Sequence, residues 1–64
     1  MREILEIEFE GKTYEVTYKL EKDMIHVRAG FDSKWATVRA TPPAVLARII
    51  GMELLTDAKR KGLL

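Results

Sequence analysis

The sequence predicts an α+β fold, a four-stranded antiparallel β-meander followed by one C-terminal α-helix. Apolar and polar residues alternate as far as residue 40, with the period of half-buried strands. After Pro43 the apolar residues recur at helical spacing. The segment Thr41-Pro42-Pro43 separates the two patterns, because proline lacks a backbone N–H and has a fixed φ, and so suits neither a sheet ladder nor a helix interior.

Four strands follow from the alternation, and their β-branched and aromatic residues suit a sheet. They are expected at about Glu3 to Phe9, Thr13 to Leu20, Met24 to Ala29 and Lys34 to Ala40. The face turned to the helix would carry Leu5, Ile7, Phe9, Tyr14, Val16, Tyr18, Leu20, Ile25, Val27, Ala36 and Val38. The opposite face would carry Glu6, Glu8, Glu15, Thr17, Lys19, His26, Arg28, Trp35, Thr37 and Arg39.

The register of the strands follows from parity, because residues opposite each other must point to the same face. The first hairpin therefore has either a two-residue loop at Glu10-Gly11 or a four-residue loop over residues 10–13. Leu20 is expected opposite Ile25, with Met24 in the turn. The third connection is expected to cover residues 30–33. Sequential pairing of neighbouring strands is the simplest topology, and residues 1–64 are expected to form a single domain.

The helix is expected to run from about residue 43 to residue 61. Thr41 is a candidate N-cap, and proline suits the first helical position. Gly62 offers a C-terminal stop, preceded by three basic residues that complement the negative end of the helix dipole. Gly51 lies inside the helix, where glycine costs about 1 kcal/mol relative to alanine. It would mark a kink, a close approach of the helix, or simple tolerance.

Length and composition restrict the class of protein. A chain of 64 residues without cysteine cannot use disulfides or thiolate metal sites to support its small core. A single histidine does not make a zinc site, so no cofactor is expected. No apolar run approaches the roughly 20 residues of a membrane span, and a cytoplasmic protein is expected. No nucleophile elbow, HExxH motif or phosphate-binding glycine loop is present, so an enzyme is not expected.

The predicted helix carries two apolar stripes. One contains Leu46, Ala47, Ile50, Gly51 and Leu54, and the other contains Val45, Ile49 and Met52. Arg48 and Glu53 lie on the borders between the stripes. Since one sheet face covers one stripe, the second stripe predicts a homodimer interface. The alternative is a deeply curved sheet that covers both stripes within one chain.

The outward sheet face supplies a second hypothesis. Net charge is +1, but residues 1–23 carry a net −3 and residues 24–64 a net +4. Basic groups beside an exposed aromatic ring are typical of single-stranded nucleic-acid binding, and the candidates here are Lys19, Arg28, Trp35 and Arg39. The alternative is a solvated sheet face of mixed charge. For Trp35 the alternative is that its ring folds over Phe31 or caps the end of the core.

The second half of the chain carries Ser33-Lys34 and Pro42-Pro43-Ala44-Val45-Leu46-Ala47-Arg48. In these motifs it resembles a set of short uncharacterised bacterial proteins that combine an S-K-x strand start with a P-P-x-x-L-A-R helix start. The resemblance implies no activity. The chain departs from this resemblance at Gly51, where a larger apolar residue is expected. The sequence as a whole thus predicts a homo-oligomeric interaction module without catalysis, with weak nucleic-acid binding as the alternative.

Overall fold

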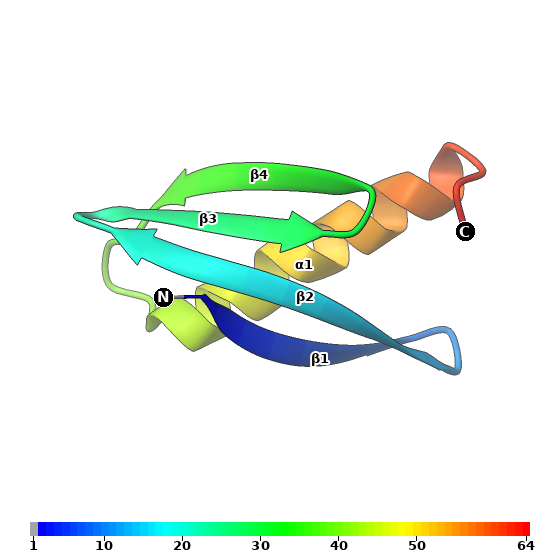
Figure 1. The fold of residues 1–64 in the computed structure, drawn as a ribbon, viewed down its shortest axis with the longest axis horizontal. Coiled ribbons are helices and arrows are strands. Elements are labelled where there is room, and N and C mark those ends of the chain that lie inside the picture. Colours follow the sequence, from blue (N-terminus) through cyan, green and yellow to red (C-terminus); the bar gives the residue numbers. More distant parts are fainter. Residues whose placement is uncertain (1) are drawn as a thin grey trace.

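The computed structural model describes residues 2–64 and confirms the predicted α+β fold. One antiparallel sheet has the strand order β1-β2-β3-β4, and α1 crosses behind it obliquely, from the start of β1 to beyond the turn between β3 and β4 (Figure 1). The elements are β1 (Glu3–Phe9), β2 (Lys12–Glu21), β3 (Met24–Ala29), β4 (Asp32–Thr37) and α1 (Pro43–Arg60).

The first two hairpins have two-residue turns. Phe9 pairs with Lys12 across Glu10 and Gly11, whose φ values of 52° and 80° match a type I′ turn, so the shorter of the two expected loops is present. Leu20 pairs with Ile25 as predicted. The prediction that Met24 lies in the second turn is wrong, because Met24 pairs with Glu21 and the turn is Lys22-Asp23.

The fourth strand differs from the prediction. Ala29 pairs with Asp32, so the turn is Gly30-Phe31 and not the four residues 30–33. Strand β4 therefore begins two residues earlier than expected and ends at Thr37. The backbone N–H of Val38 then donates to the Asp23 carbonyl at 2.7 Å, which anchors the chain where it leaves the sheet. Residues 38–42 form the connection to the helix.

The prolines, rather than Thr41, define the start of the helix. Pro42 is the N-cap residue, with φ −57° and ψ 144°, and no side chain caps the helix. The predicted Thr41 cap is wrong because Pro43 takes the first helical position and holds the residue before it in an extended conformation. At the other end, Gly62 N–H donates to Lys59 O at 3.0 Å and Leu63 N–H to Ala58 O at 2.8 Å, the two bonds of a Schellman motif.

The core lies between α1 and the inner sheet face. Its members are Ile7, Val16, Ile25, Val27, Ala29, Ala47, Ile50, Leu54, Leu55 and Ala58. Leu20 has the predicted inward parity but is 46% exposed. The pairing of β1 with β2 ends at Tyr18, so Leu20 has no neighbour from β1 to cover it.

Gly51 marks the closest approach of the helix to the sheet. A Cβ atom placed there would overlap the Cδ1 atom of Ile7 and lie 3.5 Å from both methyl groups of Val16. The α-helix is continuous through this position. Of the three interpretations of Gly51, the structure therefore supports a close approach of the helix to the sheet.

We expect Gly51→Ala to lower the free energy of unfolding by about 1 kcal/mol, since overpacking costs about 1–3 kcal/mol and the gain in helix propensity returns about 1 kcal/mol. Ile7→Val, which removes the overlapping methyl group, should cost about 1 kcal/mol alone. The double variant should be less destabilised than the sum of the two, as measured by urea unfolding.

Gly30→Ala is the matched control for this prediction, because a Cβ at Gly30 meets no atom within 4 Å. It should leave stability nearly unchanged. Strict additivity of the changes at Gly51 and Ile7 would show that the two side chains do not compete for the same space.

Candidate functional site

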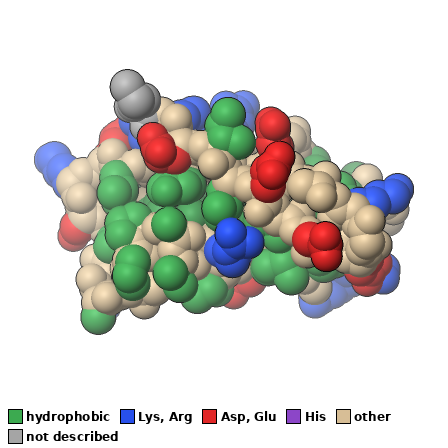
Figure 2. All heavy atoms as spheres, turned by 90° about the horizontal axis from the view of Figure 1, so that it is seen from below, with side chains coloured by type: hydrophobic (Ala, Val, Ile, Leu, Met, Phe, Trp, Pro, Cys, Tyr) green, Lys and Arg blue, Asp and Glu red, His purple; other side chains and the backbone are tan. Residues whose placement is uncertain are grey.

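The face of α1 that points away from the sheet carries Val45, Ile49 and Met52, which we call the helix outer face. The three residues are 48%, 50% and 38% exposed, in that order. Because Ala47, Ile50 and Leu54 are buried on the opposite side of the same helix, the sheet does not cover the outer face. Figure 2 shows hydrophobic side chains gathered at the end of the molecule where α1 begins, at the left of the view.

Charged residues flank the helix outer face on both sides. On one side, Glu53 accepts a hydrogen bond from Lys34 of β4 at 3.0 Å. On the other side, Lys59 pairs with Glu10 in the β1–β2 turn. Exposed ion pairs of this kind contribute little to stability, but they identify which flank of the helix faces β4 and which faces β1.

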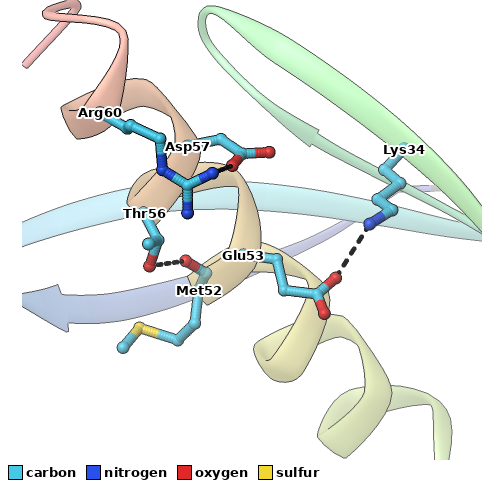
Figure 3. A pocket seen from close by; sticks show the side chains of 6 residues that line it. All are labelled: Lys34, Met52, Glu53, Thr56, Asp57 and Arg60. Atoms are coloured by element: carbon cyan, nitrogen blue, oxygen red, sulfur yellow. Dashed lines mark hydrogen bonds and ion pairs between the residues drawn. The ribbon is translucent and has the colours of Figure 1, made fainter.

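A shallow groove lies beside the helix outer face, between α1 and β4 (Figure 3). Its polar groups are directed mainly at one another: Lys34 at Glu53, and Arg60 at Asp57 across 3.7 Å. The Thr56 hydroxyl donates to a backbone carbonyl one turn earlier, at 2.8 Å. The groove is lined by Lys34, Met52, Glu53, Thr56, Asp57 and Arg60. Within residues 2–64 no cluster of His, Cys, Asp and Glu could hold a metal ion.

The outer sheet face carries a row of three side chains on neighbouring strands. Lys19 pairs with His26, and His26 with Trp35. The imidazole and indole rings are stacked, with centroids 4.2 Å apart and an interplanar angle of 4°. Lys19 also forms an ion pair with Glu21 at 2.8 Å, and this hydrogen bond together with the Lys19 charge lowers the pKa of the Glu21 carboxyl.

The four nucleic-acid candidates do not share one surface. Arg28 is exposed in the next row of the outer face, between Thr17 and Ser33. Its row adjoins that of Lys19 and Trp35. The placement of Arg39 on this face is wrong, because β4 ends at Thr37 and Arg39 lies in the connection to α1.

Acidic residues occupy the other half of the outer sheet face. Glu6 lies directly opposite Glu15, and Glu8 lies opposite Thr13. All three glutamates are exposed. Like charges in opposed positions destabilise a strand pair, and they also repel any polyanion that extends from the basic rows toward β1.

Sequence reasoning missed the ring stack and one exposed apolar residue. The stack depends on the two-residue Gly30-Phe31 turn, which sets His26 opposite Trp35. The length of this turn is decided by local backbone geometry. With the expected four-residue connection, His26 would lie opposite a different residue of β4. Ile4, 66% exposed, lies opposite Thr17 on the outer face. The sequence did carry a signal for this position: Ile4 is separated from Glu6 and Glu8 by even numbers of residues, so it points to the same outer face as they do.

Comparisons with known proteins give no relative. No family model matches the chain, and no significant match exists among curated proteins or solved structures. The resemblance to short bacterial proteins stays a prediction. In the part of the chain that the structure describes, no helix is both long and apolar enough to cross a membrane.

Because Glu6 and Glu15 repel each other, we expect Glu15→Gln to raise the free energy of unfolding by about 0.2–1 kcal/mol. The gain should shrink in high salt, which screens exposed charges. Glu3→Gln is the control, since Glu3 faces Tyr18 and should change stability less. Equal effects of the two variants at low salt would contradict the repulsion. Chemical unfolding at two salt concentrations measures both.

Proposed function

We propose that this protein is a homo-oligomeric interaction module without a catalytic role, and that it self-associates through Val45, Ile49 and Met52. The observation that supports this is their exposure in successive turns of α1, on the side away from the sheet. Contiguous apolar surface of this kind is uncommon on a monomer unless it serves an interaction.

The size and charge of the chain favour a second copy as the partner. A 64-residue domain buries only about 60% of the surface that its unfolded chain exposes, less than a larger domain does, and oligomerisation is one of the usual ways to add buried area. The net charge of +1 leaves little repulsion between copies. The proposal includes a cytoplasmic location, which the cysteine-free composition favours.

We expect the protein to form dimers in sedimentation experiments at micromolar to high micromolar concentration. Ile49→Lys should shift the equilibrium to monomer, because burying an ammonium group in an apolar contact is unfavourable. The control is Ile4→Lys, which makes the same substitution at an exposed isoleucine on the outer sheet face. It should leave association unchanged.

A wild-type protein that stays strictly monomeric at several hundred micromolar would overturn the proposal. Equal loss of association in Ile49→Lys and Ile4→Lys, with both variants folded by circular dichroism, would move the interface away from the helix outer face.

The second candidate function is weak binding of single-stranded nucleic acid by the outer face of β2 to β4. The specific observation is the row of Lys19, His26 and Trp35 with Arg28 beside it. A base could stack on Trp35, which is 49% exposed, while Arg28 neutralises a phosphate. The adjoining glutamates limit such a site to a short stretch of strand.

If this binding occurs, oligothymidylate should change the fluorescence of Trp35 at low salt, and Arg28→Gln should weaken binding severalfold. Loss of one phosphate contact should also reduce the slope of log affinity against log salt by about 0.7. Arg39→Gln, which removes an equal charge outside the outer face, should have a smaller effect. Absence of any signal at low salt would exclude the site.

A further inference from the structure

The helix outer face has the spacing of a coiled-coil seam. Val45, Ile49, Met52 and Thr56 follow one another at intervals of four, three and four residues, which is the spacing of d and a positions in a heptad. The first three are exposed apolar residues, and Thr56 continues the line as an exposed residue. A partner helix that follows this seam would lie along α1 rather than cross it steeply.

The charges beside the seam distinguish the two directions in which a second copy can pack. Arg48 immediately precedes Ile49, and Glu53 immediately follows Met52, so the two occupy g and e positions on opposite flanks. In a parallel pair the g side of one helix meets the e side of its partner, and a g residue faces the partner's e residue five positions later. In an antiparallel pair the g side of one helix meets the g side of its partner, and the e side meets the e side.

We infer that two copies associate with their α1 helices parallel, with Arg48 of each copy facing Glu53 of the other. This inference rests on the self-association proposed above. Each end of the seam then meets the same end of the partner. Antiparallel packing would instead turn Arg48 toward the partner's flank that carries Arg48, and away from Glu53.

Both charged groups are available for this contact. Among residues 2–64, Arg48 is exposed and makes no ion pair. The contact between Glu53 and Lys34 uses Oε1, which leaves Oε2 for a second donor. Lys34 also holds the Glu53 carboxylate on the flank of the helix that faces β4. An arginine fork can donate to a carboxylate that already accepts one bond.

The apolar seam is short, and this limits the affinity. Three apolar residues and two exposed charge pairs make an interface at the low end of the size range, so we expect a micromolar dissociation constant. The charge pairs should determine the direction of helix packing more than the affinity of the dimer. Exposed ion pairs add little affinity, but arrangements that place like charges together are disfavoured.

The experiment uses two single-cysteine variants, Val45→Cys and Thr56→Cys, in a chain that has no cysteine of its own. Disulfides need Cα atoms within about 7 Å. A parallel pair brings residue 45 to 45 and residue 56 to 56, so each variant should form a disulfide dimer on oxidation. In an antiparallel pair two copies of residue 45 are separated by about 16 Å, and only a mixture should cross-link, between 45 and 56.

Peptide mapping without reduction identifies the linked residues, and sedimentation of the reduced variants reports association independently. Association with only 45–56 links overturns the parallel arrangement and leaves the proposed function standing. No association of the wild-type or reduced proteins ends both proposals. Cross-linking that persists equally in the urea-unfolded protein would also overturn the inference, because it would reflect random collision.

A charge variant gives a second readout of direction. Arg48→Glu should raise the dissociation constant about tenfold at low salt, because it sets two carboxylates against each other in the parallel pair. Arg39→Glu changes net charge equally at a residue outside the helix and should have a smaller effect. Unchanged or tighter association of Arg48→Glu would contradict the parallel pairing.

Discussion

The close contact between Gly51 and Ile7 determines how the rest of the molecule is arranged. A side chain at position 51 would overlap Ile7, so the helix can lie this close to β1 and β2 only because glycine is there. The position of Gly51 against the sheet fixes the rotation of α1 about its own axis. That rotation buries Ala47, Ile50 and Leu54 and leaves the helix outer face toward solvent. The loss of helix propensity at glycine is the cost of this packing.

A single helix on a single sheet leaves two large surfaces uncovered. The outer sheet face is mostly polar, which suits an antiparallel sheet with one side in water. The outer side of the helix is not polar in its first half, although a surface helix normally carries charges there. The exposed apolar residues are therefore better explained by a contact outside the folded monomer than by its own stability. The near-neutral charge of the chain makes a second copy an acceptable partner.

Periodicity predicted most of the fold, and the errors lie where local geometry decides. Strands β1 and β3 have the predicted bounds, and the pairing of Leu20 with Ile25 follows from parity alone. The two-residue turn at Gly30-Phe31 was not predictable from turn composition, and it moved β4 so that Arg39 left the sheet. The exposure of Leu20 depends on where β1 begins, a tertiary property. For the candidate site, helical spacing was enough to place Val45, Ile49 and Met52 on one side, while the ring stack of His26 and Trp35 required the true register.

The two candidate surfaces lie on opposite sides of the molecule, so one does not exclude the other. In a dimer paired through α1, the helices form the centre and both outer sheet faces remain in solvent. Any ligand that a sheet face binds would then meet two sites in one particle, and linked sites raise the overall affinity without a new contact. A parallel pair relates the two faces by rotation about the helix direction, so their basic rows lie at the same height along the dimer. Weak binding at each face would become appreciable only for a ligand long enough to reach around the dimer. If both proposals hold, self-association of the helix would set the length of ligand that the sheet can recognise.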